Sequence, residues 1–241
     1  MIEFEHVGKS FGDTTAVEDL CFTVPGGEFL ALVGSSGSGK STTLRMMNRL
    51  VDHDRGTIRF QGEDIRLRRP EDLRRRMGYA IQSIGLFPHW SVARNIATVP
   101  QLLGWPRARI EARVDELLAM LGLEPARFRN RRPRELSGGQ MQRVGVARAL
   151  AADPEVLLMD EPFGALDPVT RRSLQGEMAR IHRASGKTIV LVTHDMEEAL
   201  SLATRIMLMD QGRIVQDASP AQLQADPAND LVRSFLGRGP R

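Results

Sequence analysis

The feature that most constrains this chain is an apolar run, Phe29–Val33, that leads directly into the glycine-rich stretch GSSGSGKST at residues 34–42. A continuous apolar run of this length predicts a strand buried on both faces of a parallel sheet. The stretch after it satisfies the pattern G-x-x-x-x-G-K-[ST], in which glycines let backbone N–H groups turn inward around phosphate oxygens. The sequence therefore predicts an α/β fold with a phosphate-binding loop between a strand and a helix.

The residues at the end of this loop are predicted to contact phosphate and a metal ion. A helix predicted over residues 40–50 would direct the positive end of its dipole at a bound phosphate. Lys40 can reach the β- and γ-phosphates, and the hydroxyl of Ser41 can ligate Mg²⁺. The alternative is a chance glycine-rich turn, which the flanking strand and helix argue against.

A second apolar run, at residues 156–159, ends in the acids Asp160 and Glu161. At the carboxyl edge of a parallel sheet, such acids face the ligand crevice. Asp160 suits the Mg²⁺ shell, directly or through water, and Glu161 suits polarisation of an attacking water. The alternative is a pair of solvated loop acids, which are common after strands.

A third motif, LSGGQ at residues 136–140, precedes a helix predicted over residues 141–151. Ser137 is a good N-cap, and Gly138 and Gly139 would let an anion approach closely. The alternative is a capped helix start without a ligand. One nucleotide needs only one phosphate loop, so a second anion site predicts that the chain shares nucleotide with a second copy of itself.

The composition excludes several classes of protein. With 241 residues, 41% hydrophobic and 26% charged, the chain suits one large domain or one core with an inserted subdomain. No apolar run approaches the roughly 18–20 residues that cross a bilayer, and the N-terminus does not resemble a signal peptide, so we expect an intracellular protein. We expect the single cysteine, Cys21, to be a buried structural thiol.

The basic residues do not indicate a nucleic-acid partner. The formal net charge is only +3, and a Pro-Glu-Asp turn interrupts the densest basic cluster, at residues 66–76. No aromatic side chains interleave with this cluster, as a surface for stacking single-stranded bases requires. We interpret it as a solvated helix face and expect no nucleic-acid partner.

The order of predicted elements gives the organisation of the chain. Strand-like runs at residues 2–7 and 20–24 are followed, beyond residue 92, by a helical period that places Ile110, Val114, Leu117, Leu118 and Leu121 on one stripe. Strands and helices alternate again from residue 156, and a hairpin turn is predicted at residues 210–212. This alternation predicts a mainly parallel sheet with helices on both faces.

These motifs occur in the order found in ATP-binding subunits of ABC transporters, and the chain resembles that family over essentially its whole length. LSGGQ is the family's signature motif. The resemblance implies a P-loop NTPase core with a mainly parallel sheet, an N-terminal antiparallel β subdomain and an inserted α-helical subdomain. We expect a single ABC ATPase domain, in which residues 1–88 and 152–236 form the core, 89–151 the helical insert and 237–241 a disordered tail.

The resemblance also implies cofactors, a reaction and a partner copy. ATP and Mg²⁺ are the expected cofactors, and ATP hydrolysis is the expected activity. In a head-to-tail homodimer, each ATP would lie between the loop of one copy and the signature of the other, and the signature residues acting in trans are Leu136, Ser137, Gly138, Gly139 and Gln140. The expected nucleotide-binding residues are Phe11, Val17, Gly34, Ser35, Ser36, Gly37, Ser38, Gly39, Lys40, Ser41 and Thr42.

Several other positions match residues with defined roles in the family. Phe11 stands where the family has an adenine-stacking aromatic, more often tyrosine; the alternative is a core phenylalanine. Gln82 matches the glutamine that senses Mg²⁺ and the attacking water, Asp167 a residue that communicates across the dimer, and His194 the histidine that contacts the γ-phosphate. The expected catalytic residues are Glu161, His194, Gln82 and Lys40, and the expected Mg²⁺ ligands are Ser41, Gln82 and Asp160.

The expected membrane partner follows from the lack of a membrane span. If the ATPase drives transport, it must dock on integral membrane permease subunits, which would place it at the cytoplasmic face of the bacterial inner membrane. Leu86, Phe87 and Trp90 follow Gln82, where the family receives the permease's coupling helix, and they suit a helix-in-groove contact. The alternative is a plain hinge between subdomains. A substrate-binding protein would be an indirect partner.

The cargo is indicated only by likeness. Residues 81–82, 85–89, 95–105 and 227–232 resemble the quaternary-amine osmoprotectant importers, whose cargoes are glycine betaine, choline or carnitine, yet none of these residues would touch the cargo. An importer of polar amino acids or methionine is the alternative. An ABC ATPase of DNA repair or chromosome maintenance would carry longer coiled-coil or zinc-binding insertions. Glu161 and His194 argue against a regulator that binds nucleotide without hydrolysing it.

Overall fold

The computed structural model describes residues 1–81, 85–164 and 166–238. The chain divides into two compact units, one formed by Met1–Arg74 with Gly186–Arg241 and the other by Arg75–Ser185. The finer division predicted from the sequence, with a helical insert at residues 89–151, stays a prediction. Gly237 and Arg238 donate hydrogen bonds to Ser234 and Arg233, while residues 239–241 of the predicted disordered tail lie outside the described residues.

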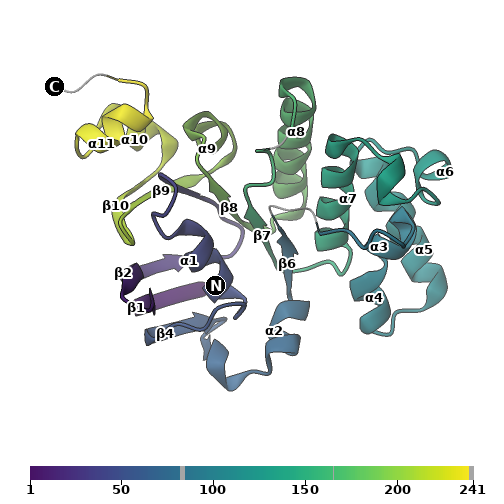
Figure 1. The fold of residues 1–241 in the computed structure, drawn as a ribbon, viewed down its shortest axis with the longest axis horizontal. Helices are drawn as coiled ribbons and strands as arrows, with labels where there is room; N and C mark the ends of the chain where they lie inside the picture. The colour runs from purple at the N-terminus through teal and green to yellow at the C-terminus, as the bar shows by residue number, and fades with distance from the viewer. Residues whose placement is uncertain (82–84, 165, 239–241) are drawn as a thin grey trace. The chain divides into compact units, whose positions relative to one another are not determined.

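The first unit contains an antiparallel sheet in the strand order β2-β1-β4-β5 (Figure 1). Its strands are β1 (Ile2–Phe11), β2 (Thr14–Val24), β4 (Arg55–Phe60) and β5 (Glu63–Asp64). Alternate residues of β2 are buried, and the rings of Phe4 and Phe22 stack with centroids 4.4 Å apart on this inner face. The predicted antiparallel β subdomain is therefore confirmed.

The same alternation corrects the expectation for Cys21. Leu20 and Phe22 are buried, and Cys21 between them is exposed, because successive side chains of a strand point to opposite faces. The prediction of a buried structural thiol was wrong.

The first unit also holds parallel strands, with β3 (Phe29–Val33) between β8 (Thr188–Thr193) and β9 (Arg205–Asp210). Every residue of β3 and β8 is buried, as expected for strands covered on both faces. β10 (Arg213–Ala218) pairs antiparallel with β9 across the predicted hairpin turn, where Gln211 and Gly212 adopt φ values of 46° and 77°.

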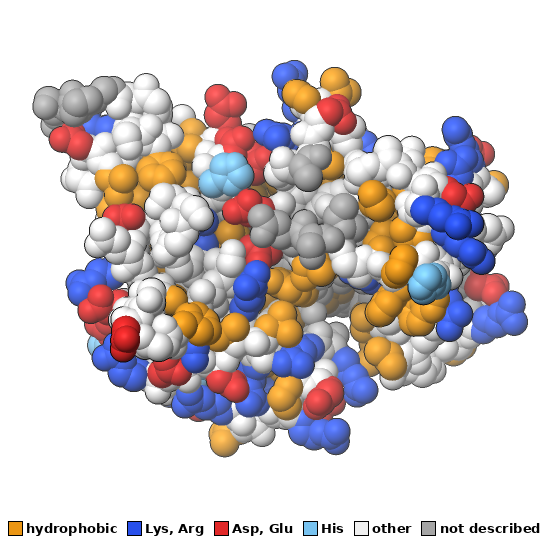
Figure 2. Space-filling view, in the orientation of Figure 1, with side chains coloured by type: hydrophobic (Ala, Val, Ile, Leu, Met, Phe, Trp, Pro, Cys, Tyr) orange, Lys and Arg blue, Asp and Glu red, His pale blue; other side chains and the backbone are white. Residues whose placement is uncertain are grey.

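Among the described residues of the first unit, six helical segments accompany these strands. They are α1 (Lys40–Met47), the 3-10 turn η1 (Ile65–Leu67), α2 (Pro70–Arg75, whose last residue belongs to the second unit), α9 (Met196–Leu202), α10 (Pro220–Ala225) and α11 (Asp230–Phe235). Leu73 is the only buried residue of α2, so this basic segment is the solvated helix that the sequence predicts. On the face in Figure 2, Lys and Arg side chains are interspersed with Asp and Glu.

The second unit contains the parallel strands β6 (Met77–Ala80) and β7 (Val156–Asp160) and most of the helices. The helices are α3 (Val92–Ile96), α4 (Thr98–Leu102), α5 (Arg107–Met120), α6 (Pro125–Phe128), η2 (Pro133–Glu135), α7 (Gly138–Leu150) and α8 (Pro168–Ser185). The apolar stripe predicted for α5 is buried. Among the described residues, no helix combines the length and apolarity needed to cross a membrane.

Candidate nucleotide site

The glycine-rich loop joins β3 to α1 in a backbone conformation that only glycine fits. Gly34 and Gly39 have φ values of 157° and 98°. A Cβ atom on Gly34 would lie 2.2 Å from the carbonyl oxygen of Met209, and one on Gly39 would lie 2.5 Å from that of Ala16. The loop therefore packs directly on neighbouring backbone, and its shape is fixed before any ligand arrives.

Lys40 places its ammonium group inside this loop. Only 5% of the residue is exposed, and Nζ donates to the carbonyl oxygens of Gly34 and Ser35 at 2.8 and 2.6 Å and to Ser38 Oγ at 3.1 Å. Burial of an ammonium costs free energy unless hydrogen bonds satisfy it, and anionic oxygens satisfy it better than carbonyl oxygens do. A phosphate group in this loop would therefore bind the Lys40 ammonium more strongly than the carbonyl oxygens that now accept its hydrogen bonds.

The start of α1 adds to this electrostatic preference. Its N-cap is Gly39, which offers no side-chain acceptor, and the first turn contains no acidic residue. The positive end of the helix dipole is therefore not neutralised from within, which favours an anion at this end.

The two residues predicted beside the base and ribose occupy different environments. Phe11, at the end of β1, is 51% exposed, so it is not a core phenylalanine, and Lys9 Nζ lies 5.1 Å from its ring centroid. Val17 is fully buried, with its side chain next to Gly39, and it supports the loop from beneath. Stacking of adenine on Phe11 and contact of nucleotide with Val17 stay predictions.

The acid pair lies in the second unit, at the carboxyl end of β7. Asp160 is 1% exposed, and the hydroxyl of Tyr79 donates to its Oδ2 at 3.3 Å. Glu161 is half-buried and has φ of 47°, a left-handed conformation that costs a non-glycine residue about 1–2 kcal/mol. Tyr79 is a contact that the sequence did not indicate.

His194 is exposed, in the first unit, on a braced loop between β8 and α9. The Thr193 hydroxyl donates to Glu198 Oε2 at 2.7 Å and accepts from the Asp195 N–H at 3.0 Å. Asp195 caps α9 by accepting from the N–H groups of Glu197 and Glu198. The structure therefore holds the backbone at His194 while its imidazole faces solvent. Gln82, the other predicted sensor, lies outside the described residues.

The signature residues begin α7 as a reciprocal cap. The Gln140 N–H donates to Ser137 Oγ at 3.3 Å, and the Ser137 N–H donates to Gln140 Oε1 at 3.0 Å, which confirms Ser137 as the N-cap. Ser137 and Gly138 are exposed, and Leu136 is buried. A Cβ atom on Gly139 would lie 2.6 Å from Thr170 Cγ2, so α7 packs closely on α8 at this point.

Asp167 has a structural contact that the sequence did not reveal. Its Oδ1 accepts hydrogen bonds from the N–H groups of Val169 and Thr170 at 3.1 and 3.0 Å, which caps the start of α8. The hydrogen bond from the Thr170 side chain, with these backbone bonds, lowers the pKa of the Asp167 carboxyl. Its role across a dimer stays a prediction.

The predicted permease contact forms an aromatic pair. Phe87 is 44% exposed, Leu86 and Trp90 are half-buried, and the Phe87 and Trp90 rings lie with centroids 4.3 Å apart. The Arg94 guanidinium lies 4.3 Å from the Trp90 ring centroid. These side chains present an apolar surface with a basic border.

Two residues that the sequence did not single out hold this loop in place. Asn95 is fully buried, accepts from the Phe87 N–H at 2.8 Å, and donates to the carbonyl oxygens of Phe87 and Ser91 at 3.2 and 3.0 Å. Arg148, on α7, donates to the Gly85 carbonyl at 2.7 Å. The helix that begins at the signature is therefore bonded to the loop that carries the aromatic pair.

A parallel strand that runs into a glycine-rich loop with a buried Lys40, together with a strand that ends in two acids, defines a P-loop nucleotide-binding fold. Comparison with known proteins specifies the class further: residues 17–164 match the family described as ABC transporter. The chain belongs to this family, and it is an ATPase of the ABC type. The resemblance and the fold class predicted from the sequence are confirmed.

Curated relatives agree over nearly the whole chain. The chain is 67% identical, over 99% of its length and 77% of the relative's, to the glycine betaine uptake system ATP-binding protein YehX of Escherichia coli strain K12. It is 48% identical to the glycine betaine/carnitine/choline transport ATP-binding protein OpuCA of Bacillus subtilis and 49% identical to the osmoprotectant import ATP-binding protein OsmV of Salmonella typhimurium. These two alignments span 99% of this chain but only 63% and 64% of the relatives' lengths.

Solved structures show the same fold. A dimeric post-hydrolysis state of the ATP-binding cassette MJ0796, bound to ADP and Pi, aligns with a TM-score of 0.83 at 30% identity and covers 91% of this chain and 99% of that one. The structure of cbiO1 from Clostridium perfringens, part of an ABC transporter complex, aligns with a TM-score of 0.85 at 27% identity and covers 93% and 90% of the two chains.

Proposed function

We propose that this chain is the ATP-hydrolysing subunit of an importer for quaternary-amine osmoprotectants of the glycine betaine, choline and carnitine class. The main support for this choice of cargo is the 67% identity, over 99% of the chain, with a protein named for glycine betaine uptake. ATP-binding proteins named for sulfate and thiosulfate import are 45–47% identical, so identity at that level does not determine a cargo. An importer for polar amino acids or methionine has no comparable support.

The residues of the site fit a magnesium–ATP substrate. Carboxylate and hydroxyl oxygens are the ligands that Mg²⁺ prefers, and Asp160 offers a buried carboxylate while Ser41 lies in the first turn of α1, beside the loop. Gln82 would complete the set. When bound, Mg²⁺ would neutralise charge on the phosphates. We propose that the loop and Lys40 hold the phosphates, and Glu161 polarises the attacking water.

The remaining roles follow from the same proposal. His194 would donate to the γ-phosphate from its braced loop, and the exposed N-terminus of α7 would approach the γ-phosphate bound by a second copy. The support is the exposure of Ser137 and Gly138 and the dimeric state of the MJ0796 cassette named above. Hydrolysis would remove the shared ligand and let the dimer open. Phe87 and Trp90 would contact a permease at the cytoplasmic face of the membrane, and the permease would receive cargo from a substrate-binding protein.

The cargo proposal is tested by uptake in cells that lack this chain. At high osmolarity, the wild-type gene should restore uptake of radiolabelled glycine betaine, and the Glu161→Gln variant should not. Sulfate and methionine uptake serve as controls in the same cells. Restored sulfate or methionine uptake, with glycine betaine uptake unchanged, would exclude the proposed cargo while leaving the ATPase assignment intact.

A further inference from the structure

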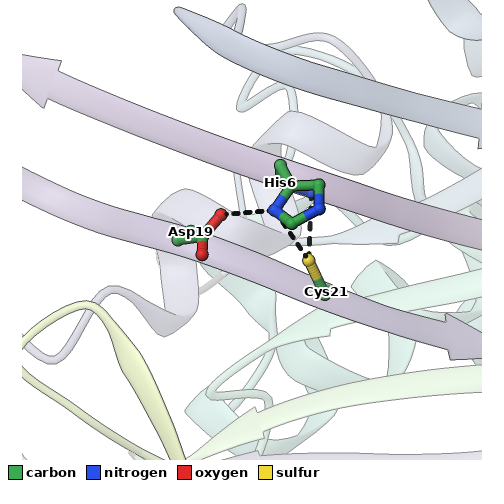
Figure 3. Close-up of side chains that lie close together, drawn as sticks. All are labelled: His6, Asp19 and Cys21. Carbon is green, nitrogen blue, oxygen red and sulfur yellow. Dashed lines mark hydrogen bonds and ion pairs between the residues drawn. The ribbon is translucent and has the colours of Figure 1, made fainter.

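A cluster of three potential metal ligands lies on the β1–β2 hairpin. His6 Nδ1 is 2.8 Å from Asp19 Oδ1 and 3.5 Å from Cys21 Sγ, and the ligand atoms of all three residues lie within 4.8 Å of one another (Figure 3). All three residues are exposed, so water and ions reach them. We propose that these side chains form a binding site for a divalent transition-metal ion, with Zn²⁺ as the preferred ion.

The backbone aims these side chains at one point. The register between β1 and β2 shifts between Phe4 and Val7 and again between Val7 and Lys9, so His6 and Asp19 lie in two β-bulges on opposite strands. His6 and Asp19 have φ values of 51° and 52°. Bulges of this kind turn a side chain away from the regular alternation of its strand. Without them, His6 and Cys21 would not converge with Asp19.

The neighbouring strand accommodates the first bulge. A Cβ atom on Gly56, which has φ of 78°, would lie 2.3 Å from the carbonyl oxygens of both Glu5 and His6. Only glycine lets β4 approach the bulged segment this closely. The position of His6 is therefore fixed from two sides, by β2 and by β4.

The distances suit zinc coordination. Zn–N bonds of about 2.0–2.1 Å and a Zn–S bond of about 2.3 Å at a tetrahedral angle place the nitrogen and sulfur about 3.5 Å apart. His6 Nδ1 and Cys21 Sγ are 3.5 Å apart. The corresponding nitrogen–oxygen separation is about 3.4 Å, so the Asp19 carboxylate, now at 2.8 Å, would retreat by about 0.6 Å to admit the ion. Asp19 is two-thirds exposed and has room to move.

The chemistry of the donors selects the ion. One imidazole nitrogen, one carboxylate oxygen and one sulfur are the mixed ligands that Zn²⁺ accepts, whereas Mg²⁺ and Ca²⁺ prefer oxygen alone. The His6 N–H lies 3.2 Å from Cys21 Sγ and orients the sulfur toward the imidazole, as outer partners of metal ligands do. Three protein ligands leave the fourth position to water, so the ion would cross-link β1 and β2 without closing the site.

The alternative explanation is an ordinary surface ion pair. His6 and Asp19 side chains are 79% and 67% exposed, and such pairs contribute little to stability. In this explanation the Cys21 sulfur serves only as the acceptor of the His6 backbone N–H. The two explanations differ in one measurable property, because only a metal site binds an ion through the Cys21 sulfur.

The test uses the tag-free full-length chain, free of nucleotide, titrated with Co²⁺ and then with Zn²⁺. The sequence contains one cysteine, so a thiolate-to-cobalt charge-transfer absorption reports on Cys21 alone. We expect one Co²⁺ per chain with this absorption, displaced by Zn²⁺, and a higher melting temperature with Zn²⁺. Cys21→Ser should abolish the absorption, and His6→Ala and Asp19→Asn should weaken affinity by about tenfold or more.

The matched control is Asp13→Asn, an exposed aspartate in the turn of the same hairpin. It should bind Co²⁺ as the wild-type chain does. Absence of the charge-transfer absorption in the wild-type chain would overturn the proposal, as would unchanged affinity in His6→Ala. One ion per two chains, with zinc-dependent dimers in sedimentation, would also overturn it, because the ligands would then come from two copies.

Discussion

Replacement of Asn95 by alanine tests whether one buried side chain fixes the loop that carries Phe87 and Trp90. Asn95 makes hydrogen bonds of 2.8, 3.2 and 3.0 Å to the backbone of Phe87 and Ser91 and has no exposed surface. Each such bond contributes about 1 kcal/mol, and alanine would leave the Phe87 N–H without its acceptor, while the Phe87 and Ser91 carbonyls would keep only their bonds from the Trp90 and Asn95 N–H groups. The expected loss is about 3 kcal/mol, a large share of the roughly 5–15 kcal/mol by which proteins of this kind are stable.

The most direct assay is amide hydrogen exchange of the segment that contains Phe87. If Asn95 holds this segment, the local opening free energy falls by about 3 kcal/mol, and exchange of the Phe87 amide accelerates by roughly a hundredfold. Asn130→Ala, at an exposed asparagine of the same unit, is the control and should leave exchange unchanged. Exchange in Asn95→Ala that matches the wild-type rate would refute the reasoning, because the hydrogen bonds of the Asn95 side chain would then not be limiting the motion.

The remaining predictions concern the site and its supports. Glu161→Gln should bind ATP, hydrolyse it far more slowly and accumulate as a closed dimer in sedimentation. ATP turnover by this variant at the wild-type rate would show that Glu161 does not polarise the attacking water. Arg148→Met, which removes the bond to the loop after β6, should keep basal ATPase activity and lose its stimulation by the permease. The pKa of the Asp167 carboxyl is lowered in the folded state. The ionised cap therefore stabilises the folded state fully at pH values above the ordinary carboxyl pKa, and this contribution is lost as pH falls through the lowered pKa. In an acid denaturation series, the difference in stability between wild type and Asp167→Asn should vanish at low pH. Ser137→Asp should keep its helix cap and lose ATP-dependent dimerisation, and Ser219→Asp should dimerise normally.

The strong local signals in the sequence correctly predicted the buried strand and the glycine-rich loop that leads from it into a helix. The predicted strand Phe29–Val33 has the bounds of β3, because a buried parallel strand has apolar residues throughout and is followed by glycines that permit only one loop shape. The predicted strand at residues 2–7 stops short of β1, which continues to Phe11. The bulge at His6 interrupts the alternation by which a strand is recognised, so the sequence pattern ends before the strand does.

Tertiary contacts account for most of what the sequence could not predict. α10 and α11 are short helices, and side-chain caps at Ser219 and Asn229 start them, so they lack the apolar periodicity that reveals longer helices. Asn95 and Arg148 act on backbone carbonyls of a distant segment, and no spacing rule connects such partners. The resemblance to the ABC family therefore predicted the chemical groups, whereas the structure was needed to find the residues that hold their loops in place.

A comparison of two identical helix caps shows what separates a structural cap from a candidate anion site. Ser137 with Gln140 and Ser219 with Gln222 form the same capping box, with matching bonds from backbone N–H to serine oxygen at 3.3 Å in both. A serine hydroxyl can also donate one hydrogen. In Ser219 that hydrogen is used, because Oγ donates to Gln222 Oε1 at 2.9 Å. In Ser137 the hydroxyl hydrogen meets no acceptor among the described residues, so the cap leaves a donor at the exposed, positive end of α7. A second anion site is therefore supported at Ser137 and not at Ser219, although the pattern of serine followed by glutamine three residues later is the same at both.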